Sequence, residues 1–190
     1  MLLKVITRDA TSAITSAAAK LHLRIDGSSE DTWLTQALAS VHRMAEAELR
    51  RAVMPITYEL QLDAFPAAEI ELPQPAASIT SITYTDSAGG AQTLSSGAYR
   101  LVGNDDSAAV FPAVSGAAWP ITGTAPDAVR VRFVGGWADA ASVPAPVVSW
   151  MLLQLGALYE NRAAIDLSAK AIDLPNRFVG HHLDDFRIYP

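Results

Sequence analysis

The sequence predicts an α+β fold, in which a helical bundle carries an inserted antiparallel β region. Apolar residues recur with helical spacing near the start of the chain, alternate with polar residues in the middle, and form a long apolar segment near the end. No segment of helical length separates the predicted strands, so parallel strands joined by crossover helices are not expected. We therefore expect two N-terminal helices and a C-terminal apolar helix to form the bundle.

Two helices are predicted before residue 54. An alanine-rich segment predicts a short helix from about Ser12 to Leu21. Ser28 and Asp31 then have the spacing of a capping box, so we expect Ser28 to cap a second helix. Apolar residues follow at three- and four-residue steps and predict its buried face. These residues are Leu34, Leu38, Val41, Ala45, Leu49 and Ala52.

The segment from about residue 55 to 137 predicts β-strands. Apolar and polar residues alternate in Ile56–Asp63, and the same two-residue period recurs in Glu69–Leu72 and Val129–Phe133. The run SITSITYTD ends in Asp86–Gly90, whose residue types predict a hairpin turn. Because these strands alternate, we expect an antiparallel sheet with one face on the core and the other in water.

The last predicted helix runs from Val147 to Arg162. Pro144 and Pro146 precede or open it, and proline is tolerated in a first helical turn. Apolar residues surround most of the helix, which predicts burial on all sides. We expect either a central position in the bundle or partial cover by a neighbouring copy of the chain. The residues expected to be buried in this way, partly at a subunit interface, are Val147, Trp150, Met151, Leu155 and Tyr159.

The composition limits the functions that the chain can have. There are 14 Lys and Arg against 20 Asp and Glu, a net charge of −6, and the charges are scattered. Because non-specific nucleic-acid affinity comes from neutralising phosphates, the chain is a poor candidate for tight DNA binding. The sequence has no cysteine, which removes disulfides and thiolate chemistry. The longest apolar stretch, residues 143–158, is interrupted by prolines and polar residues, so no membrane span is expected.

Two polar clusters are candidate sites. In Tyr159–Arg162, Glu160 could act as a general base beside Arg162. No nearby His or second acid supplies a partner, so we interpret this cluster as the C-terminal end of a helix. Asn161 suits a C-terminal cap, and Arg162 suits the negative end of the helix dipole. His181–Asp185 carries metal-ligating side chains, but adjacent histidines diverge and no third ligand is evident.

A third polar cluster, Asp105 and Asp106 after Asn104, indicates a turn, because Asn and Asp side chains hydrogen-bond to their own backbone. The alternating acids of a calcium loop are missing. We therefore predict no catalytic residue, no cofactor site and no metal site.

The order of these parts resembles a known family. The segments that carry the likeness are LHLRIDGSSEDTWL, MAEAELRRAVMPITYELQLDAFP, IELPQPAASITSITYTDSAGG, VRVRFVGGW and VPAPVVSWMLLQLGALYENR, followed by a short tail. In this order, over nearly the whole chain, they resemble the head–tail connector (adaptor) proteins of tailed phages and phage-like gene transfer agents. No single motif is specific to this family, and the resemblance rests on the order of the five segments and the tail.

The resemblance implies a structural role without catalysis. Such adaptors assemble in the bacterial cytoplasm into a ring, commonly of twelve copies, beneath the portal at the head–tail junction of the virion. The ring extends the DNA channel without sequence-specific binding and docks a neck or tail protein. An acidic chain suits a channel through which DNA must slide.

The patterns along the sequence also predict a division of the chain. Residues 1–54 and 138–175 would form the helical bundle, residues 55–137 the β insertion, and residues 176–190 a docking tail. Deleting the tail is then expected to abolish docking and to leave the fold intact. The tail residues expected to contact the portal are Arg177, Phe178, Phe186, Arg187 and Tyr189.

Two alternatives remain open. The first is another neck component, such as a tail terminator or completion protein, which would bind the tail tube in place of the portal. The second is a small metal-dependent enzyme that uses Glu160 or the two histidines, and a stoichiometric bound ion would indicate it.

Overall fold

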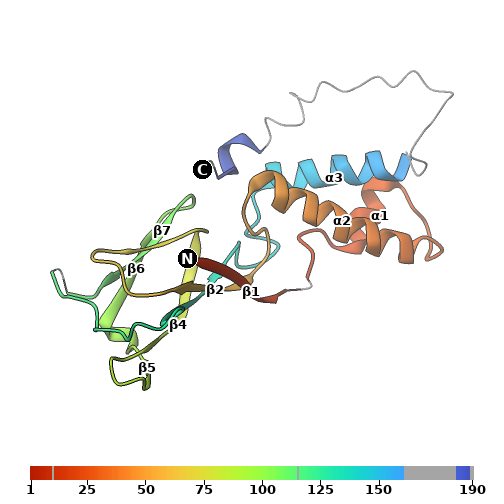
Figure 1. The fold of residues 1–190 in the computed structure, drawn as a ribbon. Coiled ribbons are helices and arrows are strands. Elements are labelled where there is room, and N and C mark those ends of the chain that lie inside the picture. Colours follow the sequence, from red (N-terminus) through yellow and green to blue (C-terminus); the bar gives the residue numbers. More distant parts are fainter. Residues whose placement is uncertain (10, 115, 161–182, 189–190) are drawn as a thin grey trace. The chain divides into compact units, whose positions relative to one another are not determined.

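The computed structural model describes residues 1–9, 11–114, 116–160 and 183–188. The chain forms two compact units. The β unit contains Met1–Asp9 and Met54–Ala138, and the helical unit contains Ala10–Val53 and Asp139–Pro190. Figure 1 shows the strands of the first unit and the helices of the second. The prediction of an α+β fold is therefore confirmed.

The β unit holds two antiparallel sheets. The larger sheet has the strand order β1-β2-β8-β4-β5. Its strands are β1 (Leu2–Arg8), β2 (Ile56–Leu62), β4 (Ala76–Thr85), β5 (Ala91–Thr93) and β8 (Val129–Gly135). The smaller sheet has the order β3-β7-β6, from β3 (Ile70–Leu72), β6 (Tyr99–Gly103) and β7 (Ala108–Pro112). Neighbouring strands run antiparallel throughout the described residues, as predicted.

The core of the larger sheet centres on β8. Val129, Val131 and Phe133 are fully buried, whereas Arg130 and Arg132 between them are exposed, which confirms the predicted alternation. Phe133 stacks on Tyr58 of β2 with ring centroids 5.4 Å apart. The turn after β4 is also confirmed, because the Asp86 carboxylate accepts hydrogen bonds from the Ala88 and Gly90 amides.

Strands β1, β6 and β7 are not predicted by the pattern of the sequence. In β1, apolar residues stand at Leu2, Leu3, Val5 and Ile6, so neither the period of a strand nor that of a helix is visible. The strand forms because β2, more than forty residues later, offers it an edge, with Lys4 opposite Glu59 in the register. Long-range pairing of this kind leaves no local signal.

The helical unit contains α1 (Ser16–Leu23), α2 (Asp31–Leu49), α3 (Ala145–Glu160) and the short 3₁₀ helix η2 (Asp184–Phe186). The three α-helices contact one another. The predicted apolar stripe of α2 is buried, from Leu34 to Leu49. Among the described residues, none of the helices is both long and apolar enough to cross a membrane.

The two N-terminal helices begin later than predicted. The first starts at Ser16 because the Thr15 hydroxyl accepts a hydrogen bond from the Ala18 amide and caps it. The prediction that Ser28 caps the second is wrong. The Asp31 amide binds the Ser28 carbonyl in a turn, and Glu30 precedes the helix without a side-chain capping bond. The carboxylate of Asp31 pairs with Lys20 instead, while still lying at the positive end of α2.

Candidate assembly surfaces

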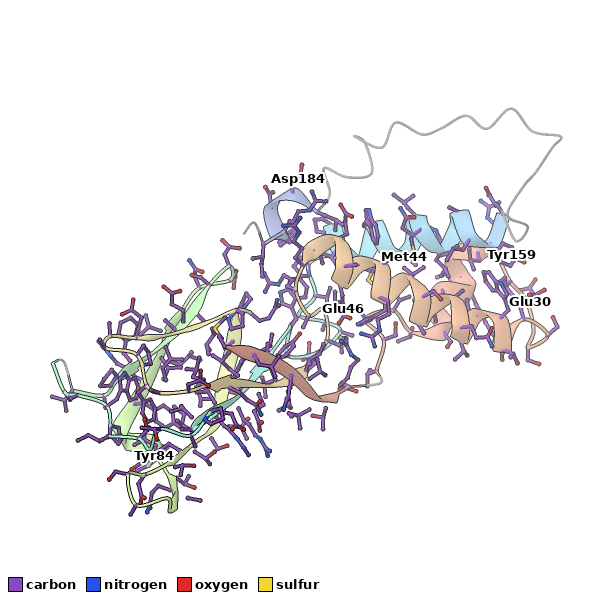
Figure 2. The ribbon with its side chains drawn as sticks, in the orientation of Figure 1. Glu30, Met44, Glu46, Tyr84, Tyr159 and Asp184 are labelled. Carbon is purple, nitrogen blue, oxygen red and sulfur yellow. The ribbon has the colours of Figure 1, made fainter. Side chains whose placement is uncertain are left out.

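Helix α3 buries one side in its own unit. Val147, Met151 and Leu155 are fully buried and Trp150 nearly so within the single chain. Tyr159 is half-buried and meets Trp33 of α2 edge to face, with ring centroids 5.4 Å apart; Figure 2 labels it at the end of the helix. Burial on all sides is not observed within the described residues, because Leu153 on the other side is 40% exposed.

The described part of the tail binds the end of α2 (Figure 1). Leu183 is fully buried. The Ile188 amide donates to the Leu49 carbonyl at 3.0 Å, and Arg187 Nε donates to the Glu48 carbonyl at 2.9 Å. The guanidinium of Arg187 also pairs with the Glu48 carboxylate.

These contacts have a clear physical reason. The last turn of α2 contains no basic residue of its own, and the chain leaves the helix through Arg50 in the left-handed region, at φ 56°. The last carbonyls of a helix carry partial negative charge and lack intrahelical donors. Arg187 supplies both a cation and a donor there. The other predicted portal contacts, Arg177, Phe178 and Tyr189, lie outside the described residues.

Only part of each polar cluster lies in the part of the chain that the structure describes. Glu160 is exposed at the end of α3. Asn161, Arg162 and the two adjacent histidines lie outside the described residues. Within the described ranges, no group of three His, Asp or Glu side chains is placed to hold a metal.

The predicted turn at Asp105 and Asp106 is confirmed. The Asn104 side-chain oxygen accepts hydrogen bonds from the amides of Asp106 and Ser107, and the turn joins β6 to β7. The acidic pair is thus part of a hairpin connection.

One polar feature of the larger sheet has no counterpart in the sequence predictions. Glu59 and Gln61 of β2 are only 5% and 7% exposed, although the alternation of apolar and polar residues places them on the strand face that is predicted to be exposed to solvent. Arg132 Nε donates to Glu59 Oε2 at 2.7 Å, and Gln61 Nε2 donates to Glu59 Oε1 at 2.8 Å. The sequence carried one signal for this buried polar cluster. A glutamate and a glutamine stand two residues apart on β2, and arginines stand at the paired positions of β8.

The surroundings of Glu59 change its titration. Burial raises the pKa of this carboxyl, but hydrogen bonds from Arg132 and Gln61 and the charges of Arg132 and Arg130 lower it more. The net result is a pKa below the ordinary value of 4.5. A carboxyl whose pKa is lowered on folding stabilises the fold above the unfolded pKa, and this stability is lost as the pH falls through the folded pKa.

We expect Glu59→Gln to flatten the acid dependence of stability. The free energy of unfolding from urea titrations at about pH 7 and about pH 3 should fall by less in the variant than in the wild type, because one linked carboxyl is gone. Glu71→Gln, at an exposed position of β3, is the matched control and should retain the wild-type difference. Equal differences for all three proteins would contradict the assignment.

The chain is similar to proteins in solved structures. No protein-family profile and no curated protein matches the sequence. One solved structure that does match is the virion of a native gene transfer agent (GTA) particle. The match covers 100% of this chain and 97% of the other, with a TM-score of 0.77 and 23% identity. The chain has the fold of a gene transfer agent protein.

Two further matches concern the neck of such particles. A chain in the neck of an empty GTA particle, computed with C6 symmetry, matches with a TM-score of 0.75 and 23% identity. A chain in the neck of a native GTA particle, computed with C12 symmetry, matches with a TM-score of 0.74 and 22% identity. Both matches cover 100% of this chain and 97% of the other. The resemblance predicted from the sequence is therefore confirmed at the level of the GTA neck fold.

Proposed function

We propose that the chain is a head–tail adaptor, a structural subunit of a ring beneath the portal of a phage-like particle. The ring extends the DNA channel and docks the next neck or tail protein. The observation that carries this proposal is the match over the full length of the chain to proteins of GTA necks. The C6 and C12 symmetries of those necks support a ring of identical subunits, and we propose twelve copies.

The proposed subunit contact on α3 lies on its less buried side. Val147, Met151 and Leu155 are already enclosed by their own unit, so their contribution is to the core of the subunit. Leu153 and the half-buried Tyr159 are the positions of this helix at which a neighbouring copy adds cover.

The charges on the larger sheet support passage of DNA without tight binding. Arg130 pairs with Asp127 at 2.6 Å, and Arg132 pairs with Glu59 at 2.7 Å. Each arginine is thus partly neutralised by an acid of the same subunit, in a chain with a net charge of −6. Weak attraction for phosphates suits a channel through which DNA slides.

The function is tested by recovering the partners of the tagged chain from lysates of the cells that produce the particles. Peptide mass spectrometry should identify a portal protein together with a neck or tail protein. Recovery of tail proteins alone would favour a tail terminator or completion protein. Recovery of no particle protein, or a stoichiometric metal ion in the purified chain, would overturn the structural assignment.

The tail assignment has its own test. Because Arg187 is bound to Glu48, the described tail residue that we assign to the portal contact is the half-buried Phe186. Phe186→Ala should reduce recovery of the portal with the tagged chain, while the urea midpoint changes little. Leu21→Ala, which removes an exposed apolar side chain of α1 that belongs to no proposed contact, serves as the control. Unchanged portal recovery for the Phe186 variant would move the portal contact elsewhere.

A further inference from the structure

Strand β1 has a free, apolar edge. It lies at one end of the larger sheet, and no described strand pairs with its outer side. An edge strand exposes a row of backbone N–H and C=O groups that a strand of another chain can bind. Leu2, Val5 and Ile6 are 53%, 52% and 41% exposed, and Lys4 among them is exposed as well. The edge is therefore both apolar and basic.

Strand β3, at one end of the smaller sheet, has the opposite character. Its Ile70 and Leu72 are buried inside the β unit, whereas Glu71 is exposed. An open groove of about 370 Å³ runs beside it. The groove is lined by Met1, Leu62, Ala64, Pro66, Ala68, Glu69, Ile70 and Glu71. Most of this lining is apolar, and its two charged side chains are acids.

We propose that β1 of one copy pairs edge to edge with β3 of the next copy in the ring. Pairing would place Leu2 and Lys4, which share one face of β1, beside the groove, with Leu2 against its apolar lining and Lys4 near Glu71 or Glu69. The other free edges among the described residues fit less well. Strand β5 (Ala91–Thr93) carries no charge, and β6 carries Arg100, which would repel Lys4.

This inference rests on the proposed ring and supplies a contact that builds it. The two edges are different surfaces of one chain, so the contact is head to tail, and a repeated head-to-tail contact generates rings when the rotation closes. Pairing of β1 with β1 would instead be two-fold and would stop at a dimer.

The absence of cysteine from the sequence permits a direct cross-linking test. Lys4→Cys and Glu71→Cys are made as separate chains, expressed together in cells that assemble particles, and treated with a short bis-maleimide. We expect a cross-linked dimer only in particles that contain both variants. Since each chain carries one thiol, the product cannot form within a chain. Thr32→Cys, at an exposed position of α2, replaces Glu71→Cys in the control and should give no dimer.

Two outcomes of this experiment overturn the inference. A dimer formed by Lys4→Cys alone would show β1 paired with β1. Assembled particles that contain both variants in the neck but yield no mixed dimer would exclude the contact while leaving the adaptor proposal standing. Absence of the wild-type chain from particles, measured by peptide mass spectrometry, would be a failure of the proposed function itself.

A charge exchange gives a second readout. Lys4→Glu or Glu71→Lys alone should lower incorporation of the chain into particles by roughly tenfold, because like charges then face each other across the contact. The double variant should restore incorporation. Circular dichroism of the purified variants checks that the fold persists after these surface changes. A double variant that is incorporated no better than the single ones overturns the pairing of β1 with β3.

Discussion

Replacing Leu183 by alanine is expected to destabilise the helical unit by about 2–5 kcal/mol, the usual cost of emptying a fully buried leucine site. Leu183 is 0% exposed although it lies more than twenty residues beyond the end of α3. Its burial makes the described tail a part of the core. Urea unfolding followed by circular dichroism at helical wavelengths measures the loss.

Leu153→Ala on α3 is the matched control for this prediction. The same methylene groups are removed, but from a side chain that is 40% exposed, so the loss should be well under half as large. Equal losses for the two variants would contradict a core role for Leu183.

The role of Leu183 changes how the tail must be tested. Deletion of residues 176–190 would remove Leu183 and also Arg187, which binds the last carbonyls of α2. From this burial we expect such a deletion to destabilise the helical unit, whereas the sequence alone led us to expect an intact fold. A loss of docking after the deletion would not separate a lost contact from a damaged helical unit, whereas Phe186→Ala retains both anchoring residues.

The second large effect is expected in the β unit. Phe133→Ala should cost about 3–5 kcal/mol, because a large buried ring is removed from the central region of the sheet. Phe133 is fully buried on β8, and its neighbours in the register are Tyr58 on β2 and Ile79 on β4. The cavity would thus open between three strands. Urea unfolding, with hydrogen exchange measured on peptides of these strands, reports the change.

Phe111→Ala on β7 is the control for this substitution. Phe111 is half-buried, and its ring lies 5.7 Å from the guanidinium carbon of Arg100. Less apolar surface is exposed by its removal, so the loss of stability should be clearly smaller. A loss as large as that of Phe133→Ala would mean that the sheet core is not centred on β8.

Local patterns in the sequence were sufficient for elements whose signal lies within a few residues. The stripe on α2 and the alternation in β8 report directly which side chains are buried, because helices and strands place every third or fourth, or every second, residue on one face. The Asp86–Gly90 turn was predictable for a similar reason, since its hydrogen bonds join residues within the turn. The resemblance to adaptors depended on the order of such segments.

Contacts between distant segments decided the rest. Strand β1 depends on an edge of β2, and Glu59 tolerates burial because Arg132, 73 positions later, donates to its carboxylate. Ser28 takes part in a turn and does not cap α2 as predicted. Arg187 binds the Glu48 carbonyl at the end of α2, although the two residues are 139 positions apart. The free energy of each of these contacts is gained only when the chain has folded, so no pattern within a helix or strand records it. The helical and strand periods, the acidic charge and the order of the parts follow from the sequence, whereas the partner of each edge, helix end and buried charge follows from the fold.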